Sequence, residues 1–185
     1  CGSALDGIGV QPVLDAVVRY LPSPLDIPPV EGVDPTKRDA KATRRPSADE
    51  PFCALLFKIQ ADRHGDLHYV RVYSGRLRAN SRVYNPAKDK KENVPQLWRI
   101  QADRREQVES VAAGDIVGIV GLRHSITGDT LCDPKAPIVL ESIRFPETVV
   151  SMAIEPESSV ERKKLAVALD MLRRQDPTFR AEESD

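Results

Sequence analysis

The chain has 185 residues, of which 41% are hydrophobic and 30% are charged, and its formal net charge is −1. These values are ordinary for a globular protein with one domain or two small ones, and they exclude a chain that is basic as a whole. The three cysteines, Cys1, Cys53 and Cys132, form no C-x-x-C pattern, which argues against a metal site and fits a reducing cytoplasm. No apolar run approaches the roughly 18 residues of a membrane span, so we expect no membrane contact.

The N-terminal segment predicts one helix followed by a linker. Apolar residues recur at three- and four-residue steps between Val10 and Leu21, which is the pattern of a helix with one apolar stripe. Pro12 suits the first turn of this helix. Nothing before Cys1 supplies a surface for the stripe, so we expect the helix to be the last element of a domain that lies upstream. Residues 25–51 are rich in proline and charge, and we expect an extended or poorly ordered linker there.

From Phe52 the pattern changes to short strands separated by turns. A buried run at 52–60 is followed by alternation at 67–73, where Val70 and Val72 share one face of a strand. Short antiparallel strands at near-regular spacing predict a mainly β fold, a closed antiparallel Greek-key β-barrel. The remaining strands are expected at 82–84, 97–100, 108–111, 115–120 and 130–132, with a charged loop at 86–93.

Residues 114–133, GDIVGIVGLRHSITGDTLCD, contain two of these strands and two glycine signals. Gly118 lies inside an apolar run and indicates a bulge or a close backbone approach. The sequence Thr127-Gly128-Asp129-Thr130 predicts a turn. The stretch has no lysine and no helix after it, so its glycines do not form a phosphate loop. We therefore expect the two strands to form the hairpin that closes the barrel.

The residues after the barrel predict one strand and one helix. Thr148–Ile154 is rich in β-forming residues, and Ser158 with Glu161 forms a capping box at the start of a helix that ends at Asp176. A strand and a helix without partner strands look like the opening half of another domain. The expected fold is a barrel with a flanking helix on its N-terminal side and a strand–helix piece on its C-terminal side.

Several separated segments of the chain resemble translation elongation factor G. The set is ordered along the chain, and the YLPSP exit combined with the DPTFR entry is typical of this branch of the translational GTPases. The matching segments are 1–4 with 9–11 (CGSA, GVQ), 20–29 (YLPSPLDIPP), 71–75 (RVYSG), 114–116 (GDI), 127–131 (TGDTL), 154–156 (IEP) and 176–180 (DPTFR).

The resemblance implies a division of the chain into four parts. These are a GTP-binding-domain remnant at 1–24, the linker at 25–51, a second-domain barrel at 52–146 and the start of a third domain at 147–185.

The resemblance also implies where nucleotide would bind in a full-length parent. It places Ser3, Ala4 and Leu5 in the guanine pocket. GTPase chemistry needs a phosphate loop ending in Gly-Lys-Ser/Thr and an Asn-Lys-x-Asp motif, and both are absent here. We therefore expect no catalytic residue and no cofactor in this chain, with GTP and magnesium bound only by the parent GTPase.

The partner that the resemblance implies is the ribosome. In that family the second domain docks on small-subunit ribosomal RNA and relays the nucleotide state of the GTP-binding domain during GTP-driven translocation. Between Asp62 and Glu106 the chain has eleven Lys or Arg and six Asp or Glu, an excess that suits phosphate contacts, although a solvated barrel surface is the simpler interpretation of that composition. From charge and barrel position, the expected rRNA-binding residues are Arg71, Arg76 and Arg78, followed by Lys88, Lys90 and Lys91.

Two alternatives stay open. One is an elongation factor G paralogue that acts in ribosome recycling or rescue. The other is a free-standing RNA-binding barrel, against which the guanine-loop remnant at 1–21 argues. We expect a monomer that binds neither DNA nor membrane. Four aromatic residues lie among basic ones, as stacking groups would, although packing of the barrel is the simpler interpretation: Tyr69, Tyr73, Tyr84 and Trp98.

Overall fold

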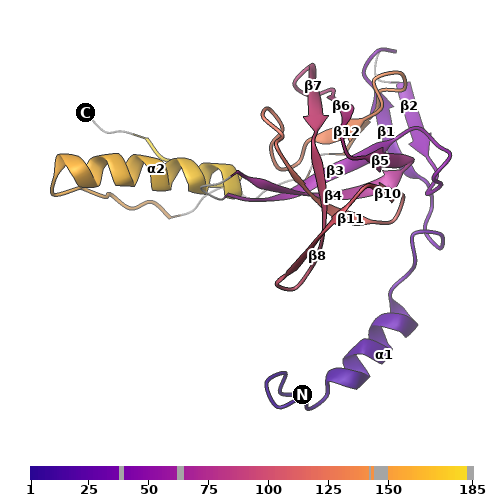
Figure 1. Ribbon diagram of the computed structural model, residues 1–185, viewed down its shortest axis with the longest axis horizontal. Helices are drawn as coiled ribbons and strands as arrows, with labels where there is room; N and C mark the ends of the chain where they lie inside the picture. The colour runs from indigo at the N-terminus through magenta and orange to yellow at the C-terminus, as the bar shows by residue number, and fades with distance from the viewer. Residues whose placement is uncertain (38–39, 62–64, 142, 144–149, 183–185) are drawn as a thin grey trace.

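The computed structural model describes residues 1–37, 40–61, 65–141, 143 and 150–182. In Figure 1 a β-barrel lies between two helices, α1 (Val10–Tyr20) and α2 (Ser159–Gln175), which extend away from it on different sides. The expected helix at the N-terminal side is confirmed. The N-cap of α2 is also confirmed, because the Ser158 hydroxyl accepts a hydrogen bond of 3.2 Å from the backbone N–H of Glu161, whereas the Glu161 carboxylate accepts from the N–H of Glu157 at 3.0 Å.

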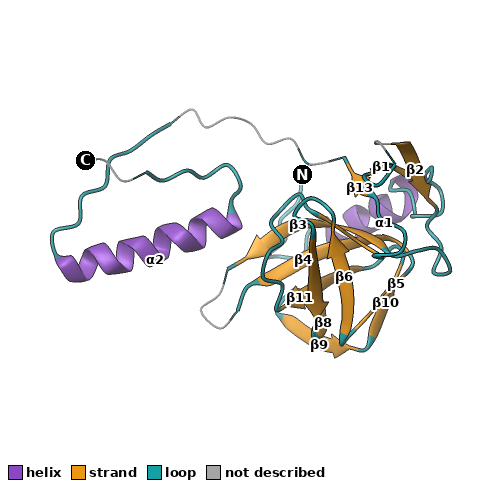
Figure 2. Ribbon diagram, turned by 90° about the horizontal axis from the view of Figure 1, so that it is seen from above, coloured by secondary structure: helices purple, strands orange, loops and turns teal. Residues whose placement is uncertain are grey.

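Antiparallel pairing forms the barrel, as expected from the short strands. The main sheet has the strand order β7-β6-β12-β3-β4-β11-β8-β9, and a ribbon of β5 and β10 accompanies it. Figure 2 shows the sheet curled around its interior. The strands are β3 (Cys53–Gln60), β4 (Leu67–Ser74), β5 (Arg76–Arg78), β6 (Ser81–Asn85), β7 (Lys90–Val94), β8 (Gln96–Gln101), β9 (Arg104–Val108), β10 (Ser110–Ala112), β11 (Ile116–Val120) and β12 (Thr130–Cys132).

The prediction of a mainly β, antiparallel barrel is confirmed, with one qualification on closure. Among the described strands, β7 and β9 are the two edges of the main sheet and do not pair with each other. The β5–β10 ribbon continues the β4–β11 pair beyond a bend at Gly75. Gly75 has φ of +73°, and a Cβ there would lie 2.6 Å from the Phe52 backbone, so only glycine fits this bend.

One apolar core fills the curled sheet, because each strand turns alternate side chains inward. On β4, Val70 and Val72 are buried in this core, whereas Tyr69, Arg71 and Tyr73 are half-buried on the outer face. Burying one such aliphatic side chain stabilises the fold by about 1.5–3 kcal/mol. Other core residues are Leu56, Leu77, Val83, Val94, Leu97, Val111, Val117, Ile119 and Leu131.

The expected closing hairpin of 115–120 with 130–132 is wrong. Strand β11 lies between β4 and β8, whereas β12 lies between β3 and β6. The connection 121–129 is longer than a hairpin turn, and it crosses the barrel to a different pair of strands. The turn at its end is confirmed, because the Asp129 N–H donates to the Ile126 carbonyl at 3.0 Å.

Gly118 marks a close approach rather than a bulge. Its strand β11 pairs in unbroken register with β4 and with β8. A Cβ at Gly118 would lie 2.8 Å from side-chain carbons of both Leu67 and Ile100. The absence of a side chain at Gly118 therefore leaves the space that the Leu67 and Ile100 side chains occupy.

The segment expected to be an extended or poorly ordered linker contains a hairpin. Strands β1 (Val30–Asp34) and β2 (Ala40–Arg44) pair with each other, and β13 (Val139–Leu140) adds to β1, giving a small sheet of order β13-β1-β2. Its apolar partners come from distant parts of the chain, because Val30 and Ala42 pack on a cluster that contains Ile138. The local composition of the segment therefore concealed the hairpin.

Two further predictions differ from the structure. Half of the expected charged loop 86–93 is strand, because β7 begins at Lys90 after a turn in which Asp89 has φ of 50°. Of the expected strand Thr148–Ile154, residues 148 and 149 lie outside the described residues, and 150–154 form no strand. This part of the chain offers those residues no neighbouring strand with which to pair.

Candidate nucleic-acid interface

Strand β5 exposes two arginines on the outer side of the barrel. Its alternation buries Leu77, which is 2% exposed, and turns Arg76 and Arg78 to solvent. The opposite residues on β10 are small, since Ala112 faces Arg76 and Ser110 faces Arg78. Within the described part of the chain neither guanidinium forms an ion pair. We call Arg76 and Arg78 the β5 arginine pair, two cations whose charge is not neutralised by a neighbour.

Arg71 lies on β4 and is already engaged. Its guanidinium carbon is 5.3 Å from the centroid of the Tyr73 ring, a cation–π arrangement. Lys58 similarly lies 5.5 Å from the centroid of Tyr69 on the same outer face. Arg71 is therefore a positioned cation with less freedom to reach a phosphate than the β5 arginine pair.

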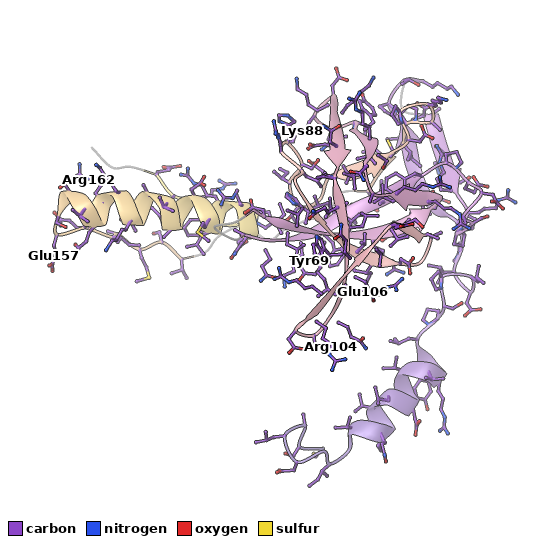
Figure 3. The ribbon with its side chains drawn as sticks, viewed as in Figure 1. Tyr69, Lys88, Arg104, Glu106, Glu157 and Arg162 are labelled. Atoms are coloured by element: carbon purple, nitrogen blue, oxygen red, sulfur yellow. The ribbon has the colours of Figure 1, made fainter. Side chains whose placement is uncertain are left out.

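The turn and first residues of the β6–β7 hairpin carry the predicted lysines Lys88, Lys90 and Lys91, all exposed. Figure 3 shows Lys88 on the side of the barrel opposite Arg104. Asp89 accepts a 2.9 Å hydrogen bond from the Tyr84 hydroxyl, which fixes the turn. We call these three residues the hairpin lysines.

A buried carboxylate holds the middle of β7. Glu92 is 2% exposed and accepts hydrogen bonds from the backbone N–H groups of Arg123 (3.1 Å) and His124 (2.8 Å) and from the Ser125 hydroxyl (2.9 Å). Burial by itself would raise the pKa of Glu92, but these three donors outweigh it and hold the pKa below its ordinary value of 4.5. The Glu92 carboxylate therefore stays ionised and ties β7 to the loop 121–129.

The same network extends to the turn before β12. The Asn85 amide donates to the Ser125 hydroxyl at 2.9 Å and to the Asp129 carboxylate at 2.8 Å, and Asp129 also accepts from the Ile126 N–H. These side chains are buried, Ile126 excepted. Buried side-chain hydrogen bonds thus connect the β6–β7 hairpin to the turn at 127–130.

The structure separates the predicted rRNA-binding residues into two groups. Val94 pairs with Ser81, next to β5, and Lys90 pairs with Asn85 at the other end of the hairpin. A strand as long as β6 spans about 16 Å, so the hairpin lysines and the β5 arginine pair lie at different ends of it.

The residues predicted to border a guanine pocket are remote from both groups. Ser3, Ala4 and Leu5 lie in a small loop closed by hydrogen bonds between Ser3 and Ile8 of 3.0 and 2.9 Å. The Ser3 hydroxyl donates to the Asp6 carboxylate at 2.7 Å. Figure 1 shows this N-terminal loop beyond α1, away from the barrel.

A third basic group was not singled out from the sequence. The β8–β9 hairpin exposes Arg99, Arg104 and Arg105, and Figure 3 shows Arg104 on this projection. Acidic residues alternate with these arginines, and Arg99 lies 4.0 Å from the Glu106 carboxylate. The charge excess there is small, so we leave this hairpin outside the candidate interface.

The aromatic residues pack on the outer face of the barrel rather than in its main core. All four are half-buried, and Tyr73 and Tyr84 pack against the small cluster beneath the β13-β1-β2 sheet. Tyr69 and Trp98 are both register partners of Gly118. Packing accounts for Tyr73 and Tyr84, while Tyr69 and Trp98 stay partly available for stacking.

The described residues show no arrangement typical of a metal site or a membrane span. Among the described residues, His, Cys, Asp and Glu side chains form no group of three suited to a metal ion. No helix in the described parts of the chain is long and apolar enough to cross a membrane.

Comparisons with known proteins bear on both flanks and on the barrel. The family model for elongation factor G domain 2 matches residues 51–134, and the model for elongation factor G domain III matches residues 145–185, which together make up more than half of the chain. The chain is also similar to a protein of known crystal structure from Thermus thermophilus, with 27% identity and a TM-score of 0.71. That match covers 98% of this chain and 25% of the other, so this chain spans about a quarter of its length.

Proposed function

Because the chain belongs to the elongation factor G family of translational GTPases, we propose that its barrel docks on the RNA of the small ribosomal subunit. There it couples the GTP-binding domain of a longer parent protein to the remaining domains during GTP-driven translocation. The observation that carries this proposal is the β5 arginine pair, two exposed cations without an ion-pair partner among the described residues of the barrel surface. Guanidinium groups suit phosphate oxygens in geometry and charge, and such contacts position a protein without reading base sequence.

The hairpin lysines are the second contact in this proposal. Their ammonium groups lie on a turn that Asp89 and Glu92 hold in place, so they would meet phosphates as point charges on a fixed support. Arg71 has a lesser role, because its guanidinium already stacks on Tyr73. The candidate rRNA-binding order therefore becomes Arg76 and Arg78 first, the hairpin lysines second and Arg71 last.

Nucleotide chemistry belongs to the parent protein in this proposal. Ser3, Ala4 and Leu5 would border the guanine ring, while GTP and magnesium would be held by a phosphate loop outside this chain. The chain itself then binds no nucleotide. A calorimetric titration of the chain with GTP and magnesium is expected to give no binding heat, and a measurable affinity would contradict the assignment. The proposed setting is the cytoplasm, with the protein as a monomer.

Salt-dependent binding to isolated small ribosomal subunits tests the docking proposal. Arg76→Gln with Arg78→Gln should weaken binding by about tenfold per arginine, since a hydrogen bond to a charged group contributes about 1.5 kcal/mol or more. The plot of log affinity against log salt concentration should become less steep: the magnitude of its negative slope should decrease by about two, one for each lost phosphate contact.

The matched control removes the same charge elsewhere. Lys163→Gln with Lys164→Gln deletes two exposed cations from the N-terminal half of α2, the half that projects away from the barrel (Figure 1), whereas Gln175 at the other end of the helix donates to the Ala61 carbonyl. This pair should leave the slope nearly unchanged. Equal losses in the two double variants would mean that binding follows net charge alone, and the β5 arginine pair would lose its assignment.

A further inference from the structure

Two of the three cysteines lie directly opposite each other in the barrel wall, outside the candidate interface. Cys53 on β3 is the register partner of Cys132 on β12. The Asp133 N–H donates to the Phe52 carbonyl at 2.9 Å, which makes the adjacent cysteine pair a non-hydrogen-bonded pair of the antiparallel ladder. In such pairs the Cα atoms are about 4.5 Å apart, within the range that a disulfide spans. The backbone therefore holds the two thiols on one face at bonding reach.

The thiols are covered by the small sheet. Cys53 and Cys132 are free thiols and are each 0% exposed. They form one apolar cluster with Ile138, which immediately precedes β13, and with Leu140, which lies in β13. Val30 of β1 packs against this cluster. Figure 2 shows β13, β1 and β2 grouped at one side of the barrel. The β13-β1-β2 sheet is thus the cover of this cysteine pair.

The covered state keeps the thiols unreactive. Burial, together with a smaller contribution from the neighbouring Cys132, raises the pKa of the Cys53 thiol to about 12, and Arg44 acts in the opposite direction. Burial also raises the pKa of Cys132. The thiolate is the reactive form, so little of it is present at neutral pH while the sheet is in place.

We propose that Cys53 and Cys132 are a modification site at which a peroxide forms a reversible disulfide between β3 and β12, with the β13-β1-β2 sheet controlling access. One thiol loses its proton and attacks a peroxide oxygen, the O–O bond breaks, and water leaves, which produces a sulfenic acid. The second thiol then attacks that sulfur, the S–O bond breaks, and another water leaves. In total the two thiols lose two electrons and two protons, and hydrogen peroxide is reduced to two waters.

Few strand pairings hold the cover, although the Leu140 N–H also donates to the Thr130 hydroxyl at 3.0 Å. Strand β13 has two residues, and only Gly32 with Leu140 and Val33 with Val139 pair it to β1 among the described residues. Short elements with few pairings open at lower free energy than core strands. Opening this sheet would expose both thiols while the main core of the barrel stays packed.

Peroxide treatment of the Cys1→Ser chain provides the test, since this background removes the exposed thiol. The expected product is a peptide that links Cys53 to Cys132, detected by mass spectrometry after digestion without reductant and lost on reduction with dithiothreitol. The crosslink closes a long loop, so the thermal midpoint should rise by on the order of ten degrees in the oxidised chain. Adding Cys132→Ser should abolish the linked peptide.

Two further variants test the role of the sheet. Ile138→Ala removes packing beneath the cover and should speed disulfide formation by at least about tenfold. Leu77→Ala removes a side chain of similar size from the main core, so it should speed the reaction much less at equal overall stability, which low urea concentrations can match. If both variants formed the disulfide equally fast, the proposal that the β13-β1-β2 sheet controls access to the thiols would be wrong.

Other results would overturn the site itself. One is peroxide that leaves both thiols free in the folded chain at doses that fully oxidise Cys1 in the unmodified protein. Another is oxidation of either cysteine to a sulfinic acid without the linked peptide. A third is a linked peptide that forms only after global unfolding.

Discussion

Replacing Glu92 with glutamine should destabilise the barrel strongly, although the two side chains have the same shape. One carboxylate oxygen accepts from the His124 N–H and the Ser125 hydroxyl, and the other accepts from the Arg123 N–H. In glutamine one of these oxygens becomes an NH₂ group, which would face the Arg123 N–H, donor against donor. Hydrogen bonds to a charged group contribute about 1.5–3 kcal/mol each, so losing one and weakening two predicts a cost of about 2–4 kcal/mol.

Urea unfolding followed by the fluorescence of Trp98 measures this cost, and Glu109→Gln serves as the control. Glu109 is exposed, and its replacement should change the free energy of unfolding by less than about 0.5 kcal/mol. The pKa of Glu92 is lower in the folded chain than its ordinary value of 4.5. The stability it provides is therefore fully present above pH 4.5 and is lost as the pH falls toward the folded-state pKa. The gap between the wild-type chain and Glu92→Gln should accordingly narrow in acid. A variant as stable as wild type at neutral pH, or a gap that widens in acid, would refute this account.

The structure also predicts how the free energy of unfolding responds to glycine replacements and to a double replacement in α1. Gly75→Ala should cost several kcal/mol in urea unfolding, because its Cβ would lie 2.6 Å from the Phe52 backbone, whereas Gly65→Ala, also at a positive φ but 3.5 Å from its nearest neighbour on Val120, should cost only about 1–2 kcal/mol. Equal costs at the two glycines would show that backbone conformation, and not the close approach, decides. Leu14→Ser with Val17→Ser in α1 should leave the free energy of unfolding of the barrel within about 0.5 kcal/mol, since neither residue is buried. A larger loss would mean that α1 packs on the barrel in solution.

Elements whose signals are local were predictable from the sequence. The alternation in β4 placed Val70 and Val72 on one face of a strand, which the structure shows to be its buried face, and Ser158 with Glu161 located the start of α2. In both cases the deciding contacts lie within one element or one helical turn. Strand β7 was missed because the residue that anchors it, Glu92, finds its hydrogen-bond partners more than thirty residues later in the chain. Without knowledge of those partners, a glutamate among lysines predicts an exposed loop rather than a strand with a buried carboxylate.

The same limit applies to strand order and to the candidate interface. Charge identified the arginines and lysines of 71–91, but it could not show that Arg71 stacks on Tyr73 while Arg76 and Arg78 form no ion pair with the described residues. The crossing of 121–129 from β11 to β12 depends on which strands lie next to each other, and a sequence of short apolar runs does not encode that order directly. Which cations carry the proposed rRNA contact stays a prediction for the binding experiment.

The β13-β1-β2 sheet has a mechanical consequence for the proposed coupling between domains. It joins the segment that enters the barrel, through β1, to the segment that leaves it, through β13. The pairing of Gly32 with Leu140 and of Val33 with Val139 is antiparallel, so the incoming and outgoing chains depart from the same end of the pair. Tension between the chain just before β1 and the chain just after β13 would therefore separate these residue pairs one after the other, whereas tension applied beyond α2 would also load the contacts of α2 with the barrel, the Arg174–Asp66 ion pair and the hydrogen bond from Gln175 to the Ala61 carbonyl. A modest force could thus separate β13 from β1 and lengthen the connection between the segments that flank the barrel, while the barrel itself stays folded.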